Sequence, residues 1–258
     1  MSRRPLVALP AAALLLLAGC AQQPAGGASA SASLSGSITV DAAASLNQVF
    51  PELAAEFESR HPGTKVQFSF GGSSALAAQI VSGQPVDVFA AASTKTMQTV
   101  VAAKQTASTP AVIARNRLEI AVPKGDPGGI RGLSDFADAS KTVVVCAKEV
   151  PCGAAAQQVF ALAGVDAKPD SYEADVTAVL TKVRTGEADA GLVYATDVET
   201  AGDQVQGIAF PQADRAVTDY PIAPLTGSSN PALAKAWVDF IVADGGSALR
   251  AAGFLAPQ

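Results

Sequence analysis

From Ile38 onward, short β-type runs alternate with helical runs, and this alternation restricts the fold of the chain more than any other feature. Val66, Phe68 and Phe70 alternate with polar residues, as in a half-buried strand. Alternation of strands and helices favours helices layered on sheets. We therefore predict an α/β fold with two lobes, each of them a mostly parallel sheet flanked by helices. Strands are expected at residues 38–40, 66–70, 86–90, 118–122, 143–145, 192–194 and 205–210, and helices at 75–82, 94–104, 154–163, 176–184 and 231–243.

Two segments have the character of crossings between lobes. Residues 115–119 leave a helix-rich region and enter a strand, and residues 210–221 are rich in Pro and Asp. A chain that leaves one lobe, builds a second and returns has two connecting segments. The prediction is one lobe from residues 38–114 with 211–258, a second from residues 115–210, and a ligand in the cleft between them.

The N-terminus has the pattern of an export signal. Arg3 and Arg4 precede an apolar run over residues 6–18, and LAGC ends at Cys20. The cysteine after small residues resembles a lipobox, so we predict a lipoprotein signal peptide at 1–19 and a lipid on Cys20. An ordinary signal peptide with a chance cysteine is the alternative. The protein would then be anchored to the outer face of the cytoplasmic membrane.

The segment that follows, residues 20–37, is small and polar and lacks charged and aromatic residues, so it is interpreted as a flexible tether. Beyond residue 20 no run of about 18 apolar residues predicts a membrane-spanning helix. Loss of the signal would leave 16 basic and 23 acidic residues, a formal net charge of −7. Such an acidic exported chain is a poor candidate for nucleic-acid binding.

Export also bears on the remaining cysteines. Cys146 and Cys152 form an even pair in an oxidising compartment, which favours a short disulfide-closed loop. A redox-active thiol pair remains the alternative, although the spacing is not CxxC.

Residues for catalysis are scarce in this sequence. His61 is the only histidine and is interpreted as a solvated residue at a helix end. No GxSxG, GxxxxGK[ST] or GxGxxG motif is present, and the spacing of metal ligands is missing. We therefore expect a binding protein without a cofactor or a directly bound metal cation, and not an enzyme.

Four turn-to-helix junctions carry small or hydroxyl residues and could present backbone N–H groups to a ligand. Ser45 follows AAA, Ser73 follows two glycines, Cys152 lies between Pro and Gly, and Val176 follows Asp175. Asp175 is a natural N-cap. A helix start with free N–H groups is an anion site, but every α/β protein has several such junctions.

Together, these stretches resemble the molybdate-binding proteins of ABC importers. The resemblance rests on an ordered set of motifs from Ile38 to Phe254: AAASL, FGGSSAL, QPVDVFAAAS, VPCGAAA, EADVTAVL, GEADAGLVYATDV and FIVADGGSALRAAGF. Each motif alone is weak, but the ordered set is specific. The resemblance implies the two-lobed periplasmic-binding-protein fold of the second type, with the ligand in the interlobe cleft.

The resemblance also implies a set of ligand contacts. Ser45 and Ser73 would donate from hydroxyl and backbone groups of one lobe. Cys152 and Val176 would supply backbone N–H groups, and Tyr194 a phenolic O–H, from the other lobe. A buried core role for Tyr194 and a plain N-cap role for Ser45 are the alternatives. Asp87 and Asp189 are interpreted as caps or turn residues.

The implied ligand is molybdate, together with tungstate, delivered by a monomeric receptor to ABC permease subunits. Molybdate is a doubly charged anion that only accepts hydrogen bonds, so a site made of donors suits it, whereas the proton of phosphate would meet no acceptor. Other readings are a receptor for sulfate, thiosulfate or another small oxyanion, an enzyme on the same scaffold, and a sensor module for a membrane kinase.

Overall fold

The computed structural model describes residues 34–258, which form one compact unit. The predicted signal peptide at 1–19, the lipidation site Cys20 and most of the predicted tether at 20–37 lie outside the described residues. Within residues 34–258, no helix has the length and apolar character needed to cross a bilayer.

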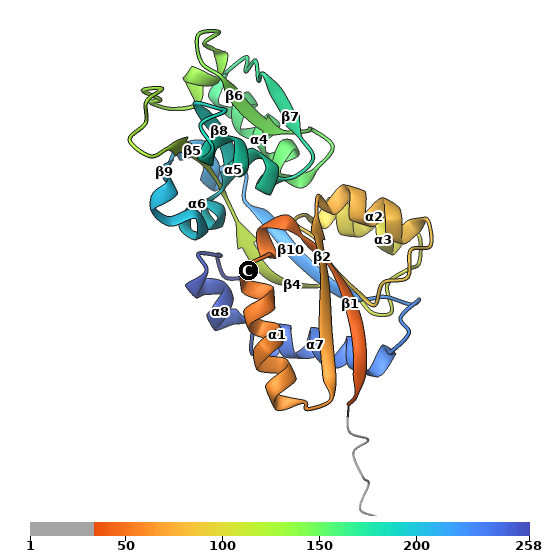
Figure 1. Cartoon of the computed structure of the whole chain (residues 1–258). Helices are drawn as coiled ribbons and strands as arrows, with labels where there is room; N and C mark the ends of the chain where they lie inside the picture. The colour runs from red at the N-terminus through yellow and green to blue at the C-terminus, as the bar shows by residue number, and fades with distance from the viewer. Residues whose placement is uncertain (1–33) are drawn as a thin grey trace, which may run out of the picture. The chain divides into compact units, whose positions relative to one another are not determined.

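The first sheet carries both chain ends of the described unit (Figure 1). Helices α1 and α7 pack on one face of this sheet, and helices α2 and α3 pack on the other. The strand order is β2 (Thr64–Gly71), β1 (Gly36–Ala43), β3 (Val88–Ala90), β10 (Thr218–Pro224), β4 (Ala111–Asn116). The helices are α1 (Val49–Arg60), α2 (Ser73–Val81), α3 (Thr94–Ala102), α7 (Pro231–Ala243) and α8 (Gly246–Ala251).

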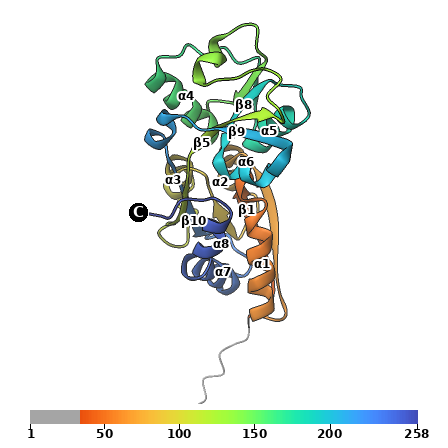
Figure 2. The same ribbon diagram turned by 90° about the vertical axis from the view of Figure 1, so that its left-hand side faces the viewer.

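The second sheet is built from the middle of the chain and carries helices α4, α5 and α6. Figure 2 shows its elements above those of the first sheet. The strand order is β7 (Ser171–Glu173), β6 (Val143–Cys146), β8 (Ala190–Tyr194), β5 (Leu118–Pro123), β9 (Val205–Ile208). The helices are α4 (Pro151–Ala163), α5 (Val176–Arg184) and α6 (Ala195–Ala201), with 3-10 turns η1 (Ala44–Leu46), η2 (Leu133–Ala137), η3 (Gly202–Gln204) and η4 (Pro211–Arg215).

The predicted α/β fold, with two sheets flanked by helices, is confirmed, but both sheets are mixed and not mostly parallel. In the first sheet β1 pairs in parallel with β2 and β3, while β10 pairs antiparallel with β3 and β4. In the second sheet β6 is parallel to β7 and β8, while β5 is antiparallel to β8 and β9. The antiparallel pairings all involve the strands next to the chain's two passages between the sheets. A connecting strand enters a sheet from the opposite end, and this direction is not encoded in hydrophobic periodicity.

The chain passes from the first sheet to the second at Arg117, the only residue between β4 and β5, and returns between η4 and β10. Asn116, the last residue of β4, is fully buried, and its amide donates to Thr196 Oγ1 on α6 at 2.8 Å. The first passage is therefore tied to the second-sheet helices by a buried hydrogen bond. The movement of residues 38–114 with 211–258 against 115–210 stays a prediction.

Local sequence signals account for several element boundaries. At the start of α7, the Asn230 side chain accepts a hydrogen bond from the Leu233 N–H, and Pro231 follows at the first helical position. Leu233, Trp237 and Ile241 of this helix are buried, and Trp237 packs edge-on against Phe50 and Phe57. The bounds predicted for α5 and α7 are confirmed, whereas β4, β7 and β10 were not recognised as strands.

Candidate functional site

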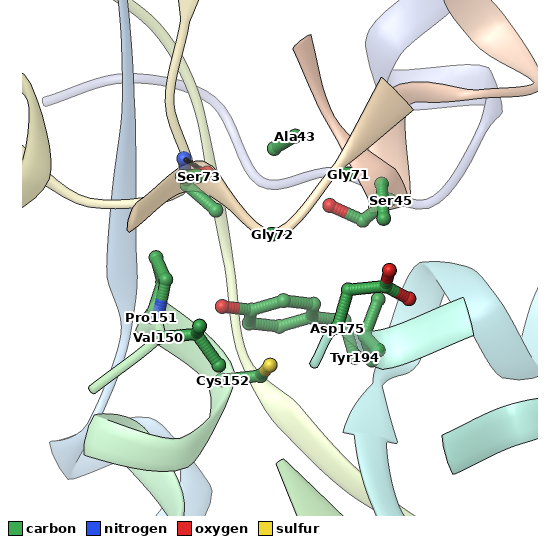
Figure 3. A pocket seen from close by; sticks show the side chains of 13 residues that line it. Ala43, Ser45, Gly71, Gly72, Ser73, Val150, Pro151, Cys152, Asp175 and Tyr194 are labelled. Carbon is green, nitrogen blue, oxygen red and sulfur yellow. Dashed lines mark hydrogen bonds between the residues drawn. The ribbon is translucent and has the colours of Figure 1, made fainter. Parts of the chain in front are cut away.

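One pocket between the two sheets is lined by all five residues that the family resemblance implies as ligand contacts (Figure 3). Ser45 and Ser73 come from the first-sheet side, and Cys152, Val176 and Tyr194 come from the second-sheet side. The structure thus brings together residues separated by up to about 150 positions in the chain. Their contact with an anion stays a prediction.

Ser45 lies in the 3-10 turn η1, directly after β1, and is 7% exposed. Ser45 was expected at a turn-to-helix junction, but it does not open the long helix that follows. Helix α1 begins four residues later, and Gln48 is its N-cap. The N-cap reading of Ser45 is therefore wrong for α1. Its Oγ lies 2.8 Å from the phenolic oxygen of Tyr220. The hydroxyl is anchored by a side chain and faces the pocket.

Ser73 is the first residue of α2 and is 2% exposed. Its Oγ accepts a hydrogen bond from the Ala92 N–H at 3.0 Å. A backbone N–H can only donate, so the Ser73 proton stays available for a ligand. The Ala75 N–H of the first turn of α2 donates to the Gly72 carbonyl oxygen at 2.9 Å, so the further donors are the N–H groups of Ser73 and Ser74. Ser73 is therefore a double donor toward the pocket.

Cys152 lies in the first turn of α4, which begins at Pro151 and not at residue 154 as predicted. Proline at the first helical position lacks an N–H, so the Cys152 amide is the first donor of this helix. A disulfide joins Cys152 to Cys146 at the end of β6, with a Cα–Cα distance of 5.8 Å. The bridge fixes the start of α4 to the sheet. The structure therefore has the predicted disulfide.

Packing around this bridge is tight. A Cβ on Gly153 would collide with the carbonyl group of Ala147, so only glycine fits behind the disulfide. The half-cystine and the glycine together hold the first turn of α4 against the loop that leaves β6.

Val176 is the first residue of α5 and is 2% exposed. Asp175 caps this helix as predicted, since its Oδ1 accepts the Ala178 N–H at 3.0 Å. The cap leaves the Val176 amide free of an intrahelical acceptor. Asp175 also lines the pocket, but one of its oxygens is held by the cap.

Tyr194 ends β8 and is 1% exposed, yet its hydroxyl has no hydrogen-bond partner within the described part of the chain. A tyrosine serving only the core would have its buried hydroxyl paired. Burial raises the pKa of the Tyr194 phenol, so the group keeps its proton and can donate it to a ligand. The backbone of Tyr194 is held by Asp197, whose Oδ2 accepts the Tyr194 N–H at 2.9 Å. An unpartnered, protonated donor is thus held at the pocket.

The pocket lining contains neither Lys nor Arg. Any anion bound there would be held by neutral donors and by the positive ends of α2, α4 and α5. Asp87 and Asp189 do not line the pocket: Asp87 accepts from the Thr39 N–H and from Ser228, and Asp189 accepts from the Thr142 N–H. Among residues 34–258, no three His, Cys, Asp or Glu side chains gather in a way that could hold a metal ion.

Two contacts across the pocket were missed by sequence reasoning. Ser74 Oγ donates to the carbonyl oxygen of Glu149 at 2.7 Å, from α2 to the loop before α4. A Cβ on Gly72 would collide with the carbonyl oxygen of Ala174, beside α5. The double glycine before Ser73 was a signal of close backbone approach, but its partner is distant in sequence. These contacts hold the two sides together next to the site.

Tyr220 was also missed. It lies on β10, inside a segment interpreted only as a crossing because Pro and Asp are frequent there. The strand nevertheless sits fourth in the first sheet. The alternation of Tyr220 and Ile222 with their neighbours could have indicated the strand.

The family model for bacterial extracellular solute-binding proteins matches residues 38–255. The molybdate-binding protein ModA of Mycobacterium tuberculosis H37Rv is 41% identical over 222 residues, or 86% of this chain and 85% of the relative. Two solved structures share the fold. The periplasmic molybdate-binding protein of Azotobacter vinelandii has a TM-score of 0.72 and 21% identity, covering 86% of this chain and 100% of that chain. The sulfate-binding protein SubI of M. tuberculosis has a TM-score of 0.73 and 17% identity, covering 84% and 86%.

These matches extend over almost the whole described unit, and the two-sheet architecture with its intervening pocket agrees with them. The chain belongs to the bacterial extracellular solute-binding proteins and, among them, to the family of the ModA molybdate-binding proteins.

Proposed function

We propose that this protein binds molybdate, and tungstate as well, and delivers the anion to the permease subunits of an ABC importer. The observation that carries the proposal is a buried pocket whose hydroxyls and helix N-termini are neutral donors, with Asp175, which caps α5, as the one charged residue of its lining. The 41% identity to a ModA protein supports the choice of ligand.

The proposed ligand contacts are the hydroxyls of Ser45, Ser73 and Tyr194 and the backbone N–H groups of Cys152 and Val176. Molybdate near neutral pH carries two negative charges and no proton, so each oxygen accepts hydrogen bonds. Hydrogen bonds to a charged group are worth about 1.5–3 kcal/mol each. A phosphate that retains a proton would place a donor against donors and would be disfavoured.

Sulfate has the same charge and shape as molybdate and is smaller, so cavity size has to separate them. The fold does not make this choice, because a sulfate-binding protein has nearly the same TM-score to this chain as a molybdate-binding one. A receptor for sulfate, thiosulfate or another small oxyanion is therefore the rival function.

Binding would proceed by closure of two lobes around the anion, with hinges where the chain passes between the sheets. The hydrogen bond from Ser74 to the Glu149 carbonyl and the close approach of Gly72 to Ala174 support a closed arrangement in which the two sides touch beside the pocket. A bound anion would stabilise that arrangement by accepting hydrogen bonds from both sides at once.

The remaining parts of the proposal concern the cellular setting. The protein would act as a monomer, exported and anchored to the outer face of the cytoplasmic membrane through a lipid on Cys20. The family's extracellular assignment supports export. A receptor role without enzymatic activity is proposed because the relatives are named as binding proteins and the pocket offers donors without an acid–base pair.

Isothermal titration calorimetry on residues 21–258, which omit the predicted signal and Cys20, tests the ligand. Molybdate and tungstate should bind tightly, sulfate far more weakly, and phosphate at pH 6 more weakly still. Sulfate affinity comparable to that of molybdate would refute the assignment in favour of the rival receptor.

A further inference from the structure

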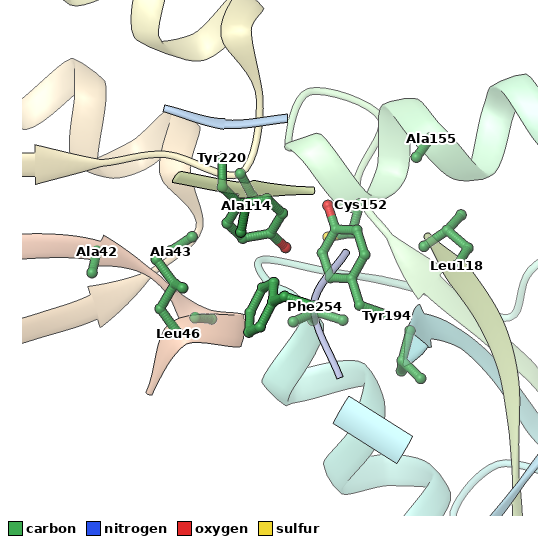
Figure 4. Packing of buried hydrophobic residues seen from close by; sticks show 14 of the residues in the cluster. Ala42, Ala43, Leu46, Ala114, Leu118, Cys152, Ala155, Tyr194, Tyr220 and Phe254 are labelled. Carbon is green, nitrogen blue, oxygen red and sulfur yellow. The ribbon is translucent and has the colours of Figure 1, made fainter. Parts of the chain in front are cut away.

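Tyr220 is a fully buried tyrosine that directly adjoins the site without belonging to the pocket lining. It lies on β10, where the pairing with β4 shifts register between Tyr220 and Pro221. Its ring packs edge-on against Tyr194 at a centroid distance of 5.9 Å and against Phe254 at 5.2 Å (Figure 4). Aromatic neighbours on two sides leave the ring little freedom, so its hydroxyl is held in one place.

That hydroxyl lies 2.8 Å from Ser45 Oγ, and both groups are buried. The distance alone does not say which oxygen donates. At Ser73, the other serine of the pocket, the direction of the hydrogen bond is known. Its Oγ accepts from the Ala92 N–H, because a backbone N–H can only donate. The donor behind Ser73 leaves the serine proton for the pocket.

Ser45 also needs a donor behind it once an anion is bound in the pocket. A serine hydroxyl has one proton, and an oxyanion without protons only accepts. If Ser45 donated to Tyr220, its lone pairs would face the anion, and repulsion would replace a hydrogen bond. The favourable arrangement has Tyr220 donating to Ser45 and Ser45 donating to the anion.

We propose that Tyr220 is a positioning residue for oxyanion binding, which donates its phenolic proton to Ser45 Oγ and so directs the Ser45 proton into the pocket. This inference rests on the proposed function, since it assumes an acceptor-only ligand at Ser45. Tyr220 does for Ser45 what the Ala92 N–H does for Ser73. The first-sheet side therefore has two serine donors, each oriented by a second donor behind it.

The protonation state of Tyr220 agrees with this role. Burial raises the pKa of the Tyr220 phenol well above its ordinary value. The group therefore keeps its proton near neutral pH. Chains of hydrogen bonds also polarise one another, so donation from Tyr220 strengthens donation by Ser45.

A double-mutant cycle tests the proposal. The affinities of the unmodified residues 21–258, Tyr220→Phe, Ser45→Ala and the double variant are measured by calorimetry with molybdate, tungstate and sulfate, and the cycle uses the tightest of the three. Tyr220→Phe keeps the ring and its packing and removes the oxygen. We expect it to weaken binding about 3- to 10-fold when Ser45 is present, and less than about 2-fold in the Ser45→Ala background.

Equal losses in the two backgrounds would show that the Tyr220 hydroxyl acts independently of Ser45 and would overturn the proposal, as would unchanged binding in Tyr220→Phe. Tyr172→Phe is the matched control, because Tyr172 is 57% exposed, and it should leave affinity unchanged. An unmodified protein that binds none of the three anions would overturn the proposed function and the role of Tyr220 with it. Binding without coupling would overturn the role of Tyr220 alone.

Thermal unfolding of each variant reports on folding. If Tyr220→Phe does not fold, 3-fluorotyrosine introduced at position 220 takes its place, because the substituted phenol is a stronger donor in nearly the same volume. Tighter anion binding is then expected, and unchanged or weaker binding would overturn the proposal.

Discussion

The two sides of the pocket both present hydrogen-bond donors, but they use different chemical groups. The first-sheet side presents side-chain hydroxyls, those of Ser45 and Ser73, each held by a hydrogen bond from behind. The second-sheet side presents mainly the starts of α4 and α5, one fixed by a disulfide and the other by the Asp175 cap. A hydroxyl can be deleted by one substitution, whereas a backbone N–H can only be displaced. The two sides should therefore respond to mutation in different ways.

A second contrast concerns buried carboxyl groups. On the first-sheet side Asp41 of β1 is fully buried, and neither carboxylate oxygen has a hydrogen-bond partner in the described structure. On the second-sheet side Asp197 accepts the Tyr194 N–H. Burial raises the pKa of Asp41 to about 6 and that of Asp197 to about 7. Asp197 holds the Tyr194 backbone at the site, whereas at Asp41 the cost of burial outweighs the stabilisation that the nearby Ser69 hydroxyl offers.

An effect as large as any other is expected where the two sides touch. Gly72→Ala places a methyl group against the Ala174 carbonyl and should keep the sides apart, because backbone atoms cannot give way. Overpacking costs about 1–3 kcal/mol, and we expect a loss of up to about 100-fold in molybdate affinity by calorimetry. Gly71→Ala is the matched control, since its Cβ would meet only Leu76 at 3.7 Å. Similar affinities for the two variants would show that closure does not depend on Gly72.

Deleting a hydroxyl on the first-sheet side should come next. Ser45→Ala and Ser73→Ala each remove one donor to a charged ligand and should cost about 1.5–3 kcal/mol, roughly 10- to 100-fold in affinity. Ser82→Ala, at the exposed end of α2, serves as the control in the same titration. A variant with unchanged affinity would remove its serine from the proposed set of contacts.

On the second-sheet side, loss of the disulfide should loosen a donor without deleting it. Replacing Cys146 and Cys152 together by serine keeps the Cys152 backbone N–H and releases the start of α4. We expect a loss of about 2 kcal/mol in the free energy of unfolding and a decrease in affinity smaller than that of either serine deletion. Calorimetry and urea denaturation measure the two effects. A decrease as large as that of Ser73→Ala would contradict the contrast between the sides.

The bridge itself is open to a direct check. Thiol titration of unfolded residues 21–258 should find no reactive cysteine, whereas two titratable thiols would refute the disulfide.

The smallest effect on binding is expected at Asp41. A substitution there should change the free energy of unfolding and not the affinity for the anion. The folded-state pKa of about 6 exceeds the unfolded value, so the folded state holds the proton more tightly, and stability falls as pH rises from about 4 through 6. Asp41→Asn removes this loss. It should raise the free energy of unfolding by roughly 1–3 kcal/mol at pH 8 and change it little at pH 4.

Urea denaturation at both pH values measures the effect. Asp138→Asn is a control at an exposed carboxyl whose pKa is lowered, not raised. A variant that is no more stable than the unmodified protein at pH 8 would show that Asp41 is compensated by contacts beyond direct hydrogen bonds.

Much of the architecture was already present in local sequence patterns. Helices α5 and α7 were predicted with their observed bounds. Asp175 was recognised as the cap of α5 from the sequence, whereas the Asn230 cap of α7 is a finding of the structure. The α/β alternation and the small residues at each strand-to-helix junction depend on neighbours in the chain and can be recognised without a structure. The five nominated site residues came from the ordered motifs, and the structure places all of them at one pocket.

Only the tertiary structure could decide what lies behind and across these residues. The contact of Ser45 with Tyr220 joins positions 175 residues apart, and the contact of Ser74 with Glu149 joins positions 75 apart. The mixed pairing of both sheets depends on the direction in which β5 and β10 enter them. A strand's periodicity records which of its faces is buried and carries no record of its neighbours or their direction. The sequence therefore determined which groups could donate to an anion, and the fold decided how each donor is aimed.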